Sequence, residues 1–187
     1  PVPEKEQIFY IGTDDADKLT LLRRDILSNF SNLPEMGEYM HRDIFNLAEK
    51  YGKDVFLSIN YLGTGSLPKF FALKAKAENF LDRIPFMNKY LPDTALYYMS
   101  KLFPQHLPKR MLDFRDKYQH HLILKMSDAG IEEAKAYLDE HWGEDSSGGY
   151  FVCSADEGKK ALLHRFAAAG AAIRYETIHR KEVAEIL

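Results

Sequence analysis

The sequence predicts an α+β fold: an antiparallel, ferredoxin-like sheet built from two β-α-β units, with its helices on one face, and interrupted by a helical, basic insertion. A strand-like run begins at Gln7 and another at His120, and each leads through a stretch of helical spacing to a further strand-like run. Between the two halves the balance of charge changes sign. The stretch from Ser66 to Lys117 holds ten Lys or Arg against five Asp or Glu, which leaves 15 against 23 for the rest of the chain.

These observations divide the chain into a first half of the sheet domain at residues 1–65, an insertion at 66–117 and a second half at 118–187. With 187 residues, of which 45% are apolar and 28% charged, the chain has the composition of a soluble globular protein. No run approaches the roughly 18 apolar residues of a transmembrane helix, so any membrane contact is expected to be peripheral. The chain begins at Pro1 and stops in a stretch that still reads as structured, so we expect an excised piece of a longer protein.

The first half reads as strand, helix and strand. Residues Gln7 to Gly12 form a short apolar run typical of a buried strand, and Thr13 or Asp14 is expected to cap the helix that follows. Pro34 is expected to end that helix, and Glu38 to His41 to form the second strand. The helix places apolar residues on one side: Leu19, Leu22, Ile26 and Phe30.

A short helix is predicted from Asp43 to Tyr51, with Gly52 as a natural stop. Val55 to Leu62 reads as another strand or an extended segment. Gly63 to Pro68 has the composition of a loop. The insertion begins after this loop.

Two proline-bounded helices are predicted in the insertion. The first carries an apolar face, and Lys69, Lys76 and Arg83 lie seven residues apart along another side. A second helix is predicted from Thr94 to Phe103, before a basic cluster at Lys109 and Arg110. The apolar face consists of Phe70, Leu73, Ala77, Phe80 and Ile84. Aromatic residues among the basic ones suit a surface that meets anionic lipid or nucleic acid.

The second half repeats the strand, helix and strand pattern. A strand is predicted from His120 to Met126, then a helix capped by Ser127 or Asp128, then a strand from Tyr150 to Cys153. The helix carries Ile131, Ala134, Leu138 and Trp142. Ser154 and Glu157 have the spacing of a capping box, and they introduce an alanine-rich helix. Beyond Gly170 the pattern is compatible with helix or strand.

Few residues point to chemistry. The sequence has no nucleotide-binding loop, no C-x-x-C and no H-E-x-x-H motif. His120 and His121 are adjacent on a strand and would face opposite sides, which argues against a shared metal ion. The best chemical cluster is His164 and Arg165 with Arg174, since Arg binds a carboxylate and His accepts a hydroxyl proton. Ordinary solvated helix charges are the alternative.

Several runs of the sequence closely resemble one family, the bacterial respiratory, quinone-dependent D-lactate dehydrogenases. The longest is HRFAAAGAAIRY, from His164 to Tyr175. Shorter ones are FYIGT at Phe9, GEYMHRDI at Gly37, AEKYGKD at Ala48, LFP at Leu102, RDKY at Arg115 and FVC at Phe151. The resemblance covers nearly the whole chain.

The resemblance implies a part of a peripheral membrane flavoprotein that oxidises D-lactate to pyruvate and passes electrons through FAD to a quinone. Residues 1–65 and 118–187 would be the two halves of its cap domain, and 66–117 its membrane-binding segment. The FAD-binding parts are missing, so the fragment alone is expected to be inactive and holds no FAD-contacting residue. The implied location is the cytoplasmic face of the cell membrane.

The resemblance also implies site residues. Related flavin enzymes hold the substrate carboxylate with an Arg on a returning cap helix, so Arg165 is the first candidate, followed by His164, His121 and Arg42. The candidates for contact with an anionic membrane are the basic residues of the insertion: Lys69, Lys74, Lys76, Arg83, Lys89, Lys101, Lys109, Arg110 and Arg115.

Two alternatives remain from the residues alone. The chain could be a free-standing module that binds RNA or a protein, but the aromatic strand signature of such RNA-binding sheets is missing, and no nucleic-acid partner is expected. Alternatively, the apolar side of the insertion could pack on the sheet domain and leave its basic residues as ordinary solvated charge.

Overall fold

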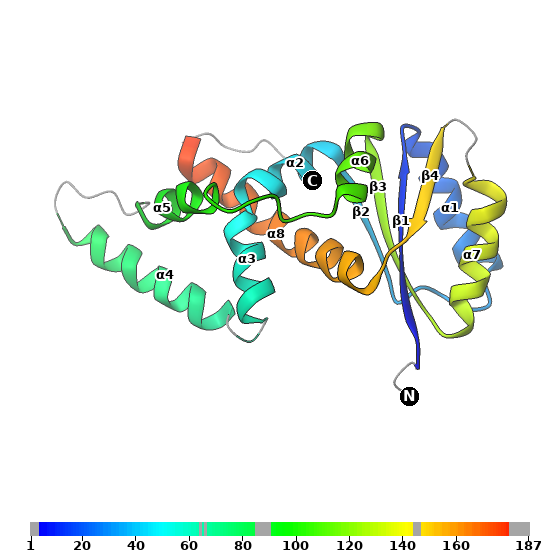
Figure 1. The fold of residues 1–187 in the computed structure, drawn as a ribbon, viewed down its shortest axis with the longest axis horizontal. Coiled ribbons are helices and arrows are strands. Elements are labelled where there is room, and N and C mark those ends of the chain that lie inside the picture. Colours follow the sequence, from blue (N-terminus) through cyan, green and yellow to red (C-terminus); the bar gives the residue numbers. More distant parts are fainter. Residues whose placement is uncertain (1–3, 64, 66, 85–90, 144–146, 180–187) are drawn as a thin grey trace. The chain divides into compact units, whose positions relative to one another are not determined.

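The computed structural model describes residues 4–63, 65, 67–84, 91–143 and 147–179 (Figure 1). The chain divides into two compact units. The sheet unit consists of Pro1–Arg42 and Leu107–Ala161, and the helical unit of Asp43–His106 and Leu162–Leu187. The predicted functional division at residues 66 and 117 stays a prediction, because compactness does not identify a membrane-binding segment.

The sheet unit contains a four-stranded antiparallel sheet, which confirms the predicted α+β class. Its strands are β1 (Glu6–Thr13), β2 (Met36–His41), β3 (His120–Ser127) and β4 (Gly148–Val152), in the order β2-β3-β1-β4. Each strand of one β-α-β unit therefore borders a strand of the other. The finer description as ferredoxin-like stays a prediction.

One face of the sheet is covered by α1 (Ala16–Asn29) and α7 (Ala129–His141). Phe9 and Ile11 of β1 are fully buried against these helices, and Trp142 closes the core after α7. The apolar positions predicted for the two helices lie in this core or pack against it: Leu19, Leu22, Ile26, Phe30, Ile131, Ala134 and Leu138.

The other face is also covered, so the prediction that helices lie on one face only is wrong. Tyr10 of β1 points to this second side, where its ring packs edge-on against Phe114 of α6 (Lys109–Lys117), 6.2 Å between centroids. Gly12 lets the rings of Phe114 and Tyr118 come close to the backbone of β1. A Cβ atom at this position would lie only 2.5 Å from the Tyr118 ring. The sequence of β1 explains why both faces are covered. Its residues from Ile8 to Ile11 are all apolar, whereas a strand with one solvent-exposed face has apolar residues only at alternate positions.

Helix α6 itself was not predicted. Its sequence is dense in charge and follows two prolines, but Pro108 serves as its N-cap and Met111 is fully buried. Proline is tolerated at a helix start, where backbone N–H groups have no partner within the helix. The basic cluster is thus a helix of the sheet unit.

The helix caps agree with the predictions in part. Asp15, rather than Thr13 or Asp14, caps α1 and accepts a hydrogen bond from the backbone of Asp17. Asp14 instead accepts from the backbone of Gln119. Helix α1 ends at Asn29, before Pro34 is reached.

Two caps of the second half were predicted. Asp128 is the N-cap residue of α7, but its carboxylate accepts from the backbone of Glu4 and Lys5 instead of the helix. The capping box is confirmed in both directions. Ser154 N–H donates to Glu157 at 2.8 Å, and Glu157 N–H donates to the Ser154 hydroxyl at 3.2 Å.

The helical unit contains α2 (Arg42–Tyr51), α3 (Lys53–Leu62), α4 (Leu67–Asp82), α5 (Leu91–Ser100) and the later part of α8 (Ala155–His179). The prediction of a strand or extended segment from Val55 to Leu62 is wrong. Val55, Phe56 and Ile59 are buried at helical spacing along α3. By sequence alone, a short apolar run is compatible with a strand or a helix. The burial of residues at helical spacing shows that this one is a helix.

Helix α8 continues through Gly170 to His179, so no stop occurs there. A helical glycine costs about 1 kcal/mol relative to alanine, but Ala167, Ala171 and Arg174 on either side are buried and hold the helix. Helix α5 begins at Leu91 and ends at Ser100, three residues earlier at each end than predicted. Pro92 falls in its first turn, where proline is tolerated.

Candidate functional site

A row of alternating basic and apolar side chains lies along the solvent-exposed side of α4. Its members are spaced by four and three residues, which places them on one side of a helix. We call this row the α4 stripe: Lys69, Leu73, Lys76 and Phe80 on the helix, and Arg83 in the turn directly after its last residue, where the Arg83 N–H donates to the Phe80 carbonyl oxygen at 3.2 Å. All five side chains are exposed, and the apolar ones are not covered, since Leu73 is 70% and Phe80 64% exposed.

The opposite side of α4 is partly buried. It carries Ala77, Glu78 and Leu81 together with Lys74, whose side chain is only 20% exposed and pairs with Glu78 at 3.3 Å. Lys74 therefore lies apart from the other basic residues of this helix. The alternative that the apolar side chains pack on the protein is wrong for Leu73 and Phe80, which share the exposed side with the cations.

Helix α5 and the turn after it add a second exposed apolar group. Tyr98, Met99, Leu102 and Phe103 form this α5 patch, and Leu102 is 85% exposed. Lys101 lies within the patch, with its ammonium 4.2 Å from the Tyr97 ring centre and 4.9 Å from that of Tyr98. A hydrogen bond with Tyr97 is the main cause that raises the pKa of Lys101, so this side chain stays charged at neutral pH.

The segment that follows α5 is tied to α2 and α3. The Lys53 ammonium donates to the carbonyl oxygen of Phe103 at 2.6 Å, and the Gln105 amide donates to Glu49 at 2.6 Å. Burial lowers the pKa of Lys53. These contacts hold the end of the α5 patch in place while its apolar side chains remain exposed.

The other predicted membrane contacts divide into two groups. Lys89 lies outside the described residues. Lys109, Arg110 and Arg115 stand on α6 of the sheet unit, whereas the α4 stripe belongs to the helical unit.

The α6 cations already have protein partners. Arg110 donates to the carbonyl oxygen of Val152 at 2.9 Å, lies 3.4 Å from a Glu157 oxygen and stacks over the Phe151 ring. Lys109 pairs with Asp113 at 2.8 Å and Arg115 with Asp116 at 2.9 Å.

Of the four substrate candidates, two are buried. His164 is 1% exposed, with Nε2 3.1 Å from the Phe45 carbonyl oxygen. His121 is fully buried beside the Tyr10 ring. Arg165 on α8 and Arg42 at the start of α2 are partly exposed, and they belong to different units. Of these four candidates, Arg165 is the one that lies on α8 and is also partly exposed, so it is the one on that helix that a substrate can reach.

Arg174, the third member of the predicted cluster, has a structural role. It is 4% exposed, pairs with the buried carboxylate of Asp54 and reaches the Tyr51 carbonyl oxygen at 3.4 Å. A guanidinium held in this way is not offered to a substrate. Sequence spacing did not show this, because Asp54 lies 120 residues away along the chain.

His121 makes the stability of the sheet unit depend on pH. Burial lowers the pKa of His121 to about 4, so the unfolded chain takes up this proton below about pH 6.5 and the folded chain only near pH 4. Acidification from pH 7 to pH 4 should therefore cost up to about 3 kcal/mol from this residue.

Urea denaturation between pH 7 and pH 4 checks this expectation. His121→Leu should remove the proton uptake and lose less stability on acidification than the unsubstituted chain. The exposed His141 provides the control, and His141→Leu should keep the full decline. An identical pH dependence of His121→Leu and the unsubstituted chain would contradict the assignment.

The described residues contain no group of three His, Cys, Asp or Glu placed to hold a metal ion. Burial raises the pKa of the Cys153 thiol to about 12, which leaves it unreactive at neutral pH. Within the described ranges, no helix is both long enough and apolar enough to cross a membrane.

Comparison with known proteins places the chain in one family. The sequence profile of the family described as "D-lactate dehydrogenase, membrane binding" matches residues 8–187. The chain is 52% identical over 184 residues to the quinone-dependent D-lactate dehydrogenase of Escherichia coli, and 48% identical over 187 residues to that of Haemophilus influenzae.

A third relative, the quinone-dependent D-lactate dehydrogenase of Corynebacterium glutamicum, is 37% identical over 181 residues. These matches cover 96% to 100% of this chain but only 32% to 33% of the relatives. The chain thus spans about a third of the length of the curated relatives that it matches.

Proposed function

This chain belongs to the family of D-lactate dehydrogenase membrane-binding domains, and we propose that it attaches a quinone-dependent D-lactate dehydrogenase to the surface of an anionic membrane. The observation that carries the proposal is the α4 stripe, in which three exposed cations alternate with two exposed apolar side chains. Such a surface can contact lipid phosphates and the acyl boundary together. Attachment is peripheral.

Electrostatic and apolar contributions to this contact are of similar size. A Lys or Arg near an anionic lipid surface contributes about 1 kcal/mol, and complete burial of a Leu or Phe side chain about 1.5–3 kcal/mol. Leu73 and Phe80 can therefore match the contribution of Lys69, Lys76 and Arg83. Salt should weaken the binding, because it screens the charges, without abolishing it.

Vesicle sedimentation tests the proposal. The chain is expected to sediment with vesicles that contain phosphatidylglycerol at low salt and to bind less at 1 M salt. With phosphatidylcholine alone it should show only the weak binding that persists at 1 M salt, because the apolar side chains then act without the charges. No sedimentation with anionic vesicles at low salt would contradict the proposal. Equal binding to both lipids would contradict the role of the cations.

The reaction belongs to the full-length enzyme, which is proposed to oxidise D-lactate to pyruvate and to pass electrons through FAD to a membrane quinone at the cytoplasmic face. The described residues do not fit FAD. One groove has an apolar lining with a single cation. Another pocket is lined by four carboxylates against one cation, Lys5, so its net negative charge would repel a pyrophosphate. FAD is therefore assigned to parts outside this chain, and the chain alone should be inactive.

Arg165 is proposed to hold the carboxylate of D-lactate in the full-length enzyme. It is partly exposed on α8, next to Phe166, which is 56% exposed, so this part of the helix presents an uncovered surface. A planar guanidinium can bind a carboxylate through two parallel hydrogen bonds, which lysine cannot reproduce.

Steady-state kinetics of the full-length enzyme tests this assignment. Arg165→Lys should lower kcat/KM for D-lactate by at least tenfold. Retained membrane attachment of the variant would show that the loss concerns the substrate. Unchanged KM and kcat would remove Arg165 from the site.

A further inference from the structure

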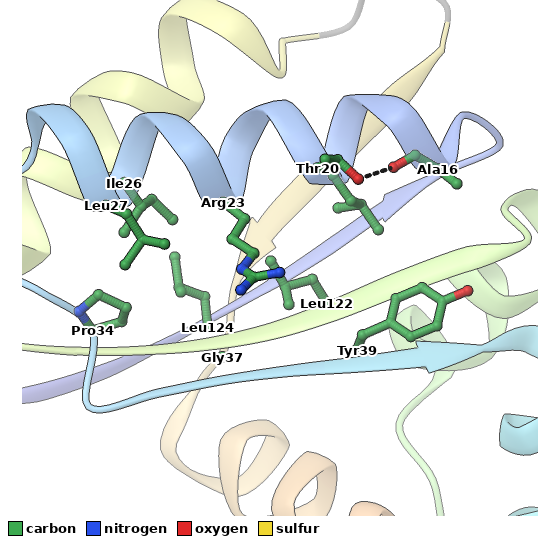
Figure 2. Close-up of a pocket in the computed structure, with 11 residues that line it drawn as sticks. Ala16, Thr20, Arg23, Ile26, Leu27, Pro34, Gly37, Tyr39, Leu122 and Leu124 are labelled. Carbon is green, nitrogen blue, oxygen red and sulfur yellow. Dashed lines mark hydrogen bonds between the residues drawn. The ribbon is translucent and has the colours of Figure 1, made fainter. Parts of the chain in front are cut away.

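An apolar groove runs between α1 and the edge strand β2 in the sheet unit (Figure 2). Its volume is about 630 Å³, within the range of small-molecule sites in proteins. The groove forms where Gly37 of β2 contributes no side chain to fill the space below the helix. Most of its lining is apolar: Leu19, Ile26, Leu27, Pro34, Leu122 and Leu124.

The two ends of the groove differ in polarity. Ile26, Leu27 and Pro34 make one end wholly apolar. Thr20 and Tyr39 lie at the other end (Figure 2), where the Thr20 hydroxyl donates to the Ala16 carbonyl oxygen at 3.4 Å and the Tyr39 hydroxyl lies 2.7 Å from His120 Nδ1. Ala16 and Leu27, at the limits of the lining on α1, stand 11 residues apart. At the helical rise of 1.5 Å per residue the groove is about 16 Å long. Arg23 stands four residues before Leu27, so the apolar end beyond it is about 6 Å long and suits a short acyl chain.

Arg23 supplies the only charged group of the lining. Its side chain points from α1 toward the sheet, between the apolar end and the hydroxyl end (Figure 2). Among the described residues Arg23 has no ion-pair partner, whereas its neighbour Arg24 lies 3.5 Å from Asp25. A cation of this kind beside an apolar groove is complementary to an anion that carries an apolar chain.

We propose that this groove binds a short-chain carboxylate, with the carboxylate on Arg23 and the acyl chain along Ile26, Leu27 and Leu124. The site lies in the sheet unit and uses no residue of the α4 stripe, so it is separate from the proposed membrane contact. The expected ligand chemistry is one negative head and one apolar chain.

Titration calorimetry with hexanoate tests the proposal. Hexanoate should bind the chain with a stoichiometry of one, and Arg23→Gln should weaken the binding at least tenfold. Arg24→Gln is the matched control and should stay within twofold. Gly37→Val should block the groove, since a Cβ at Gly37 lies 3.9 Å from Leu124 and a branched side chain suits a strand.

Three results would overturn the proposal. The first is the absence of hexanoate binding to the unsubstituted chain. The second is equal binding of hexanoate and the uncharged hexanol, or equal binding by the Arg23→Gln variant and the unsubstituted chain. The third is binding by this chain but not by the full-length enzyme, which would show that the rest of the polypeptide occupies the groove.

Discussion

Reversal of three charges, Lys69→Glu, Lys76→Glu and Arg83→Glu, is expected to abolish the binding of this chain to anionic vesicles at low salt. Each substitution removes an attraction of about 1 kcal/mol and adds a repulsion of similar size. The combined change of about 6 kcal/mol corresponds to a loss of roughly four powers of ten in affinity. Sedimentation at low salt measures the effect.

The matched control carries the same change in net charge on another surface. Lys5, Lys135 and Lys159 are exposed residues of the sheet unit, and their replacement by Glu should lower the binding far less. If both triple variants lost binding equally, net charge rather than the α4 stripe would control attachment.

Replacement of the apolar residues of the α4 stripe should change the salt dependence of vesicle binding in a different way. Leu73→Ser with Phe80→Ser should leave most of the binding at low salt and remove the part that persists at 1 M salt, because screening acts on charges and not on apolar burial. A binding curve of this variant that matches the unsubstituted chain at every salt concentration would exclude these two side chains from the contact.

Loss of the buried guanidinium of Arg174 is expected to destabilise the helical unit by about 3–5 kcal/mol. Arg174→Ala would leave the carboxylate of Asp54, which is 7% exposed, buried without its cation. A buried charge without a partner is costly, whereas replacement of both partners by apolar residues is often nearly neutral. Asp54→Leu with Arg174→Met should therefore recover most of the lost stability.

Urea denaturation followed by circular dichroism checks this order of stabilities. The exposed Arg24 supplies the control, and Arg24→Ala should change the free energy of unfolding by less than about 0.5 kcal/mol. A change below about 1 kcal/mol for Arg174→Ala would mean that the ion pair contributes little and that Asp54 finds another partner.

Features that depend on nearby residues could be predicted from the sequence. β1, β3, the helix over Leu19 to Ile26 and the Ser154–Glu157 capping box each follow from the spacing of neighbouring residues. α3 could not be distinguished from a strand, because its apolar run is short and β-branched residues suit both structures. The burial of Val55 and Phe56 on one side settles it.

Features that depend on distant contacts could not be predicted. Helical spacing shows that Leu73 and Phe80 share a side of α4, but not whether another element covers that side. The pairing of Arg174 with Asp54 joins residues far apart in the sequence. From the sequence alone, Arg174 therefore groups with Arg165 as a candidate for carboxylate binding.

The most direct test of the membrane contact is a fluorescent side chain in the α4 stripe. The chain has a single tryptophan, Trp142, which is buried in the sheet unit and serves as an unchanging baseline. In Phe80→Trp, anionic vesicles should shift the added emission to shorter wavelength, and brominated acyl chains should quench it. Emission that stays unshifted and unquenched while the variant sediments with the vesicles would contradict contact between the α4 stripe and the membrane.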